Sequence, residues 1–279
     1  LLLGPGLNIK RNPLAGRNFE YFSEDPLLAG KMAAALIRGI QSEGVGASMK
    51  HFAVNSQEKH RMSIDEVVDE RALHETYLEG FRIAVQEGNP YTVMSSYNKV
   101  NGDYTNENQP LMEILRNEWG FDGLVVTDWG GNNDRVAGLL AGNALEMPST
   151  GGITDAEIVV AVQDGSLDEA VLDAQVAEVL ELIDRTAAAN PALSDLSSIN
   201  PDFDAHHDLA VRAAEEGVVL LKNGPSQDPR LPLRQGTSVA VIGDFADDLR
   251  IQGAGSSRVN PTRTESPLDV LSAAGLNVA

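Results

Sequence analysis

The sequence predicts an α/β fold built on parallel strands, and three observations lead to this prediction. Short apolar runs alternate with helix-like segments through the first two-thirds of the chain, which is the pattern of βα units. The apolar runs resemble strands that are buried on both faces. A polar, turn-rich stretch then precedes a second, shorter series of elements. The units fit either a (β/α) barrel or a doubly wound sheet, and a complete eight-unit barrel usually needs about 250 residues.

The first domain is expected to span residues 1–190. Its helix ends are marked by local signals, since Asp25-Pro26 opens the first helix, Gly44 closes it, and Gly88 ends the second. The expected strands cover residues 1–9, 45–54, 91–98, 123–128 and 144–147. The expected helices cover residues 26–43, 66–87, 110–118, 132–141, 154–163 and 168–189.

The second domain is expected to span residues 207–279, after a linker over residues 191–206 that is rich in polar and turn residues. A helix and a short strand are expected over 207–222, a buried strand over 238–246 and a helix over 267–275. The chain begins LLLGPGLNIK, without Met and without a basic segment. We therefore expect a piece of a longer protein that lacks both ends.

Composition excludes several classes of partner. The net charge of −20 argues against nucleic acid and against an anionic membrane surface, because both require clustered Lys and Arg. The absence of cysteine excludes disulfides and thiolate ligands. The histidines lack the HExxH spacing of a zinc site, and GAGSSR (253–258) lacks the third glycine of a dinucleotide fingerprint and the GK[ST] of a phosphate loop. No metal and no cofactor are expected. The oligomeric state and the compartment stay open, with a bacterial cytoplasm favoured over secretion.

Polar side chains follow the expected strands at their carboxyl ends, where parallel βα folds place their sites. Lys50 and His51 end the second strand, Tyr97 ends the third, and Asp128 and Trp129 follow the fourth. Cationic donors, flat aromatic faces and a carboxylate on one rim suit a sugar, whose hydroxyls form hydrogen bonds and whose C–H faces stack on rings. The rim therefore predicts a carbohydrate site.

Four segments resemble the glycoside hydrolase family 3, and most closely its two-domain β-glucosidases: GPGLNIKRNPLAGRNFEYFSEDP (4–26), SMKHFAVNSQEKHR (48–61), SSYNKVNG (95–102) and LVVTDWGG (124–131). The resemblance runs in order through nearly the whole chain. It implies a partial (β/α) TIM-barrel-like domain followed by the start of an α/β sandwich domain. It also implies a retaining, exo-acting hydrolase that releases β-linked glucose from the non-reducing end of oligosaccharides or glucosides.

The resemblance also assigns roles, residue by residue. Asp128 matches the catalytic nucleophile, which forms a glycosyl-enzyme intermediate. The residues that match sugar-contacting positions are Arg17, Lys50, His51, Arg61, Met94, Tyr97, Trp129 and, in the second domain, Ser256. The family's general acid is a Glu downstream of the Ser256 loop; we find no match in this chain and expect it beyond Ala279. The isolated chain is therefore expected to hydrolyse weakly or not at all, and activated aryl glucosides should react first.

Several alternatives stay open from the sequence. Arg17 can pair with Glu20 or Glu24, Arg61 can be an exposed partner of Glu58, and Tyr97 can belong to the core. Ser256 can lie in a mere Gly-rich linker. Other activities are a β-xylosidase or a phosphorylase of the same family, or a carbohydrate-binding fragment without catalysis.

Overall fold

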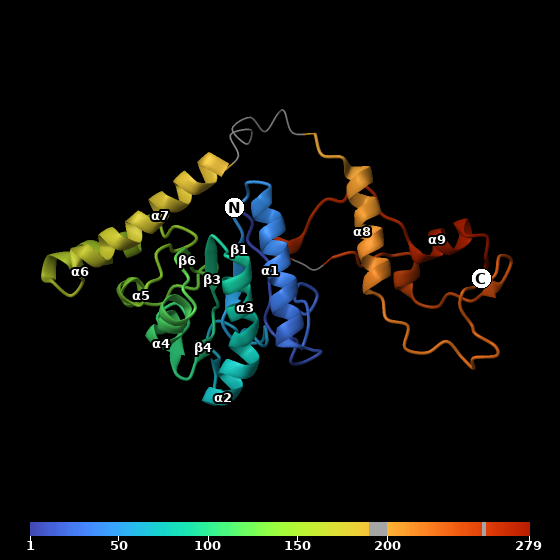
Figure 1. Cartoon of the computed structure of the whole chain (residues 1–279), viewed down its shortest axis with the longest axis horizontal. Helices are drawn as coiled ribbons and strands as arrows, with labels where there is room; N and C mark the ends of the chain where they lie inside the picture. Colours follow the sequence, from blue (N-terminus) through green and yellow to red (C-terminus); the bar gives the residue numbers. More distant parts are fainter. Residues whose placement is uncertain (190–199, 253–254) are drawn as a thin grey trace. The chain divides into compact units, whose positions relative to one another are not determined.

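The computed structural model of the chain describes residues 1–189, 200–252 and 255–279 (Figure 1). The chain folds into two compact units, Leu1–Ser194 and Asp195–Ala279.

The first unit is centred on a parallel sheet with the strand order β1-β3-β6. The strands are β1 (Ser48–Phe52), β3 (Thr92–Ser95) and β6 (Leu124–Val126), and every residue of β3 and β6 is buried. The sheet is flanked by bridges from Leu2 and Gly6 to the β1 side and from Leu145 to the β6 side. The predicted parallel arrangement is confirmed, and the three carboxyl ends share one edge.

Two predicted strands are present only as these isolated bridges. In residues 1–9, Pro5 has no N–H to donate to a ladder, so pairing is interrupted between Leu2 and Gly6. In residues 144–147, the N–H groups of both Ala144 and Leu145 donate to the single carbonyl of Val125. A regular ladder cannot continue from that double contact.

Helix α1 (Pro26–Ser42) lies beside helix α3 (Glu79–Gly88), and both cover the sheet (Figure 1). Asp25 caps α1 by accepting hydrogen bonds from the N–H groups of Leu27 and Leu28. A Cβ built on Gly30 would lie 2.8 Å from the Cβ of Ile83 and 2.9 Å from the carbonyl oxygen of Gly80. The two helices therefore meet at backbone distance, and their buried faces join the main hydrophobic core with Met49, Phe52 and Phe81.

The predicted helix 66–87 begins later than expected. Asp69 caps a continuous helical stretch made of α2 (Glu70–Ala72), the wider π turn η1 (Leu73–Leu78) and α3. The preceding residues form β2 (Asp65–Glu66). It pairs with β4 (Lys99–Val100), which forms an unpredicted hairpin with β5 (Asp103–Tyr104).

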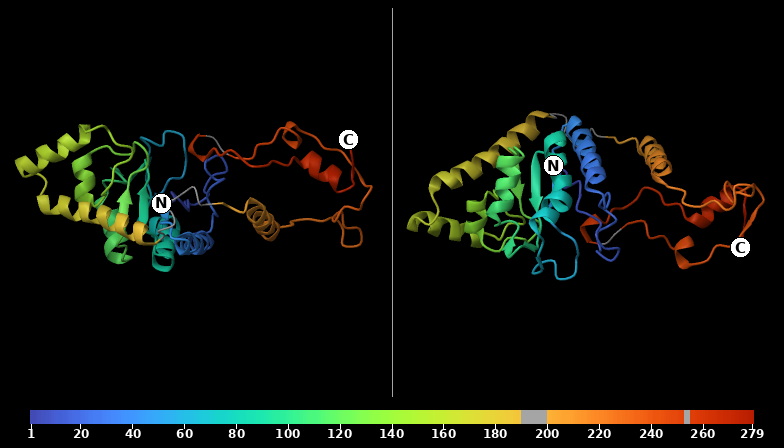
Figure 2. Two further views of the ribbon diagram at one scale, coloured as in Figure 1. Left: turned by 90° about the horizontal axis from the view of Figure 1, so that it is seen from above. Right: turned by 60° about the horizontal axis from the view of Figure 1, so that its bottom comes forward.

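The remaining helices of the first unit agree with the predicted positions. They are α4 (Gln109–Glu113) continued by η2 (Ile114–Glu118), α5 (Arg135–Ala141), α6 (Ile153–Asp164) and α7 (Glu169–Ala189). Figure 2 shows α6 and α7 flanking the segment that holds β6 and α5. Leu139, Ala161 and Leu167 form a small core between them. Arg116 of η2 donates to the carbonyls of Gly123 and Gly142 and to Glu178, which fixes α7 near the amino end of β6.

The second unit contains α8 (Phe203–Gly217), β7 (Ser238–Val239), the short 3-10 turns η5 (Asp244–Ala246) and η6 (Gly255–Ser257), α9 (Pro267–Ala273) and β8 (Asn277–Val278). Part of the predicted linker, residues 191–199, lies outside the described residues. Its remaining part is corrected, because Asp202 caps α8 and the helix starts inside the expected linker.

Two predicted strands of the second unit are wrong. Residues 218–222 form no strand, and the expected buried strand 238–246 is reduced to β7, with Ile242 94% exposed. A buried strand needs neighbours on both sides and a layer on each face, whereas β7 pairs only with β8 in the described part of the chain. No helix among the described residues is long and apolar enough to cross a membrane.

Candidate active site

Asp128 lies two residues after β6, at the edge of the sheet where the parallel strands end. Its side chain is 12% exposed. One carboxylate oxygen, Oδ1, accepts a hydrogen bond of 2.7 Å from the N–H of Trp129. The other, Oδ2, is buried and has no hydrogen-bond partner in the described residues. The loop that carries this carboxylate is fixed by Thr127, whose side chain accepts from the N–H of Met147 at 2.9 Å.

His51 in β1 faces Asp128, with 3.5 Å between Nε2 and Oδ2. The backbone N–H of His51 donates to Asn8 Oδ1 at 2.8 Å, and Asn8 Nδ2 donates back to the His51 carbonyl at 2.9 Å. The imidazole is fully buried at 1% exposure. Burial lowers the pKa of His51 well below its ordinary value, and three neighbouring cations lower it further. The ring is therefore neutral at neutral pH.

Three cations lie near this pair: Arg17, Lys50 and Arg61. Arg17 forms an ion pair with Glu20, and Lys50 Nζ lies 3.7 Å from the same carboxylate. Burial opposes the charge of Arg17, yet the hydrogen bond to Glu20 leaves its pKa raised. All three side chains are partly exposed, at 16%, 17% and 36% for Arg17, Lys50 and Arg61.

Glu58 is the second anion of this cluster. Its carboxylate accepts from Arg61 Nη1 at 2.7 Å and lies 3.9 Å from Arg17 Nε. The two glutamates, rather than Asp128, thus neutralise the cations. The suspected pairing of Arg61 with Glu58 is present, and the guanidinium also stacks 4.5 Å from the centre of the Tyr97 ring.

Tyr97 and Trp129 form the aromatic side of the site. Tyr97 is 5% exposed, and its hydroxyl donates to the Trp129 carbonyl at 2.9 Å. Burial raises the pKa of Tyr97 to about 12, with a further contribution from the Asp128 carboxylate. The Trp129 side chain is 41% exposed, so its ring is available for stacking. A Cβ on Gly131 would lie 3.3 Å from the Tyr97 ring, so the missing side chain of this glycine lets the loop after Trp129 pass close to that ring.

Two predicted site residues have no contact that tests their roles. Met94 is 2% exposed and packs in a hydrophobic cluster with Leu124, Val126 and Ala144. Ser256 is exposed in η6 of the second unit. The roles assigned to both stay predictions.

Two buried residues of the site, Tyr21 and Asn55, were not predicted from the sequence, and Glu20 was expected only as a partner of Arg17. Tyr21 and Asn55 are 4% and 3% exposed, and Asn55 Nδ2 donates to the Tyr21 hydroxyl at 2.9 Å. Both stand inside the segments that carry the family resemblance, which is the signal that could have found them. A polar hollow of about 510 Å³ lies along the same loop and is lined by Arg11, Asn12, Ser56, Gln57 and Glu66.

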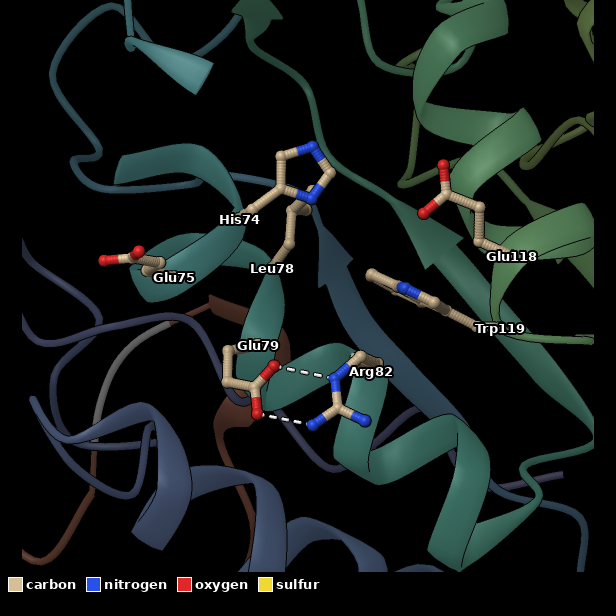
Figure 3. Close-up of a pocket in the computed structure, with 7 residues that line it drawn as sticks. All are labelled: His74, Glu75, Leu78, Glu79, Arg82, Glu118 and Trp119. Carbon is tan, nitrogen blue, oxygen red and sulfur yellow. Dashed lines mark hydrogen bonds and ion pairs between the residues drawn. The ribbon is translucent and has the colours of Figure 1, made fainter. Parts of the chain in front are cut away.

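A second hollow, of about 460 Å³, is lined by residues of η1, α3 and the end of η2 (Figure 3). It includes none of the predicted site residues. Leu78 and Trp119 form its apolar floor, and His74 and Glu118 lie at its sides. Glu79 and Arg82 form a bidentate ion pair at its edge. Arg82 Nη2 donates to Glu79 Oε1 at 2.5 Å, and Arg82 Nε donates to Glu79 Oε2 at 2.7 Å. In the described residues, no group of three His, Asp or Glu side chains could hold a metal ion.

Comparison with known proteins identifies the family. The sequence profile of the glycosyl hydrolase family 3 N-terminal domain matches residues 1–182. The chain belongs to glycosyl hydrolase family 3. The suspected family is thus confirmed, as is the TIM-barrel-like α/β fold of its N-terminal domain.

Several known proteins match almost all of the chain. It is 51% identical over 276 residues to thermostable beta-glucosidase B of Acetivibrio thermocellus, covering 99% of this chain and 36% of that protein. It is 46% identical over 286 residues to an exo-alpha-(1->6)-L-arabinopyranosidase of Bifidobacterium longum, covering 99% and 37%. The structure of beta-glucosidase 3B from Thermotoga neapolitana in complex with alpha-D-glucose superposes with a TM-score of 0.92 at 42% identity, covering 100% of this chain and 39% of that one. The chain thus spans little more than a third of the length of these relatives.

Proposed function

We propose that this chain carries the nucleophile half of a retaining, exo-acting glycoside hydrolase that acts on β-linked glucose. The observation that carries the proposal is the state of Asp128. It is a buried carboxylate at the carboxyl edge of the sheet, and among the described residues it has no Lys or Arg partner, while Glu20 and Glu58 neutralise the nearby cations. A carboxylate that is not committed to an ion pair keeps its electron pairs for attack on carbon.

The reaction would proceed in two displacements. The Asp128 carboxylate attacks the anomeric carbon, the bond from that carbon to the leaving oxygen breaks, and a glycosyl ester forms. Water then attacks the same carbon, the ester bond breaks, and the carboxylate is released. Retaining enzymes pair the nucleophile with a second carboxyl group about 5 Å away, which protonates the leaving oxygen in the first displacement and takes the proton of the attacking water in the second. We assign no described carboxylate to that role.

The other rim residues would bind the sugar. Arg17, Lys50 and Arg61 present charged donors to hydroxyl groups, and such hydrogen bonds are about twice as strong as neutral ones. The exposed ring of Trp129 offers a flat face to the C–H side of a pyranose. The phenol of Tyr97 stays protonated and fixes the Trp129 backbone beside the nucleophile.

Covalent trapping tests the nucleophile without requiring an acid. A 2-deoxy-2-fluoro-β-glucoside with a dinitrophenolate leaving group needs no protonation to depart, so the 279-residue chain itself can be used. We expect one fluoroglucosyl group on Asp128, located by peptide mass mapping, and we expect labelling of Asp128→Asn to slow by about three orders of magnitude or more. Glucose binding without any covalent label would indicate a carbohydrate-binding protein instead.

A second candidate substrate is an α-L-arabinopyranoside, favoured by the 46% identity to the Bifidobacterium longum relative. An α-L-arabinopyranoside lacks the hydroxymethyl group of glucose and has the opposite configuration at C4, so contacts to these two positions decide between the two sugars. Parallel labelling with both fluoro-sugars would rank them, and faster labelling by the pentoside would replace glucose as the proposed substrate.

A further inference from the structure

The other face of the His51 ring meets a buried tyrosine. Nδ1 of His51 lies 3.1 Å from the Tyr21 hydroxyl oxygen. The two rings meet edge to face, with 6.1 Å between their centres. A tyrosine hydroxyl can either donate its proton to Nδ1 or accept one from it, and the choice decides which ring nitrogen of His51 carries the hydrogen.

Neighbouring groups fix the direction of this hydrogen bond. Asn55 Nδ2 lies 3.4 Å from Glu58 Oε1. A carboxylate only accepts, so the NH₂ side of the Asn55 amide must face Glu58. The same NH₂ group then donates to the Tyr21 oxygen at 2.9 Å. In the described part of the chain, Tyr21 has hydrogen bonds to Asn55 and His51 alone, so Nδ1 is the one acceptor available to its proton.

We propose that Glu58, Asn55 and Tyr21 act as positioning residues that hold His51 as the neutral tautomer with its hydrogen on Nε2. That hydrogen faces the Asp128 carboxylate, whose Oδ2 lies 3.5 Å from Nε2. The opposite tautomer would aim the Nε2 lone pair at an anionic oxygen, which is repulsive, and would leave the Tyr21 proton without an acceptor. We call the hydrogen-bond chain from Glu58 through Asn55 and Tyr21 to His51 the relay. Its Tyr21 contact and the Asp128 contact of His51 therefore favour the same tautomer.

The relay gives His51 a definite role in the proposed site, and this part rests on the proposed function. A neutral ring with an Nε2 hydrogen orients the nucleophile by attraction without protonating it. A bare Nε2 would instead compete for protons and push the carboxylate away. The lowered pKa of His51 keeps the ring neutral, and the relay selects between its two neutral forms.

The tautomer can be read directly by ¹⁵N NMR of the histidine rings in the 279-residue chain, because protonated and bare ring nitrogens resonate far apart. His51→Gln assigns the His51 signals by their disappearance. Between pH 6 and 8 we expect a bare Nδ1 and a protonated Nε2 in the wild type. A protonated Nδ1 in the wild type would overturn the proposal without any variant being needed.

Tyr21→Phe removes the donor while keeping the ring. Loss of one hydrogen bond should shift the tautomer ratio by about 2- to 12-fold toward the Nδ1–H form. The matched control is Tyr104→Phe, whose hydroxyl contacts the Met62 carbonyl at 3.5 Å and not His51; it should leave the ratio unchanged. An unchanged ratio in Tyr21→Phe would contradict a directing role for Tyr21.

Titration with glucose separates this proposal from the proposed function. If the wild type has the Nε2–H form but neither binds glucose nor labels on Asp128, the relay stands and the hydrolase function fails. If it binds and labels with a proton on Nδ1, the function stands and the relay fails.

Discussion

At the scale of single residues, Asp128 is arranged for reactivity at the cost of stability. Burying a polar atom without a hydrogen bond costs about 1–3 kcal/mol, and Oδ2 of Asp128 is buried with no hydrogen-bond partner in the part of the chain that the structure describes. Glu178 in the same unit is paired with Arg116 at 2.9 Å. Unsatisfied groups of this kind are expected at sites where function, rather than folding, determines the side chain.

His51 makes the stability of the first unit depend on pH. Its pKa is lowered in the folded state, mainly by burial, whereas the unfolded value is about 6.5. Between these two values the unfolded chain binds more protons. The contribution of His51 is therefore fully present above pH 6.5 and is lost as the pH falls toward the folded pKa, by up to about 1.4 kcal/mol per pH unit.

The measurement is urea unfolding followed by tryptophan fluorescence, since both tryptophans, Trp119 and Trp129, lie in the first unit. His51→Gln should be less stable than the wild type at pH 8 and should lose less stability between pH 6.5 and pH 5.5. Parallel pH curves for the two proteins would show that His51 is not the titrating group.

The residues that could be predicted differ physically from those that could not. Lys50, Asp128 and Trp129 lie at the ends of apolar runs that predict strands. Their place on the carboxyl edge of the sheet therefore follows from the sequence. Tyr21 and Asn55 lie in loops far from each other in sequence, and only the tertiary fold brings their side chains together at 2.9 Å.

At the scale of elements, the contact between α1 and α3 depends on glycine. We expect Gly30→Ala to destabilise the first unit by about 1–3 kcal/mol, because its methyl group would overlap Ile83 and the Gly80 carbonyl, and overpacking typically costs that much. Gly39→Ala on the same helix is the matched control, since nothing lies within 4 Å of its Cβ position. Alanine there should stabilise by about 0.5–1 kcal/mol. Equal effects of the two changes on the urea midpoint would contradict close packing at Gly30.

Elements were predictable where local signals and packing agree. The Asp25-Pro26 start and the alternation of strands with helices locate α1, β1, β3 and β6 in the positions expected. The hairpin of β4 and β5 was missed because its strands are two residues each and their pairing with β2 is tertiary. In the second unit, the apolar run at 238–246 looks like a buried strand, but periodicity cannot tell whether a neighbouring layer is present to bury it.

At the scale of the whole molecule, the two units differ in their cores. The first contains the buried clusters around Phe52, Met94 and Leu139. In the described residues of the second, no hydrophobic side chain is buried, and Val218, Val219 and Leu221 are 74%, 75% and 92% exposed. Burial of apolar area is the main stabilising contribution to folding. The cooperative unfolding of this chain therefore belongs to the first unit.

The net charge of −20 sets how salt affects that unfolding. Self-repulsion among surface carboxylates destabilises a compact state, and its range falls from about 30 Å at 0.01 M salt to about 8 Å at 0.15 M. The ion pairs around Glu20 and Glu58 are partly buried and are screened less. We therefore expect the urea midpoint at pH 7.5 to rise when sodium chloride is raised from 0.01 to 0.15 M.

The control is the same pair of salt concentrations near pH 4.5, the pI of the sequence, where the repulsion is absent and the rise should vanish. A midpoint that falls with salt at pH 7.5 would mean that attractive pairs, not repulsion, dominate the electrostatics of the folded chain.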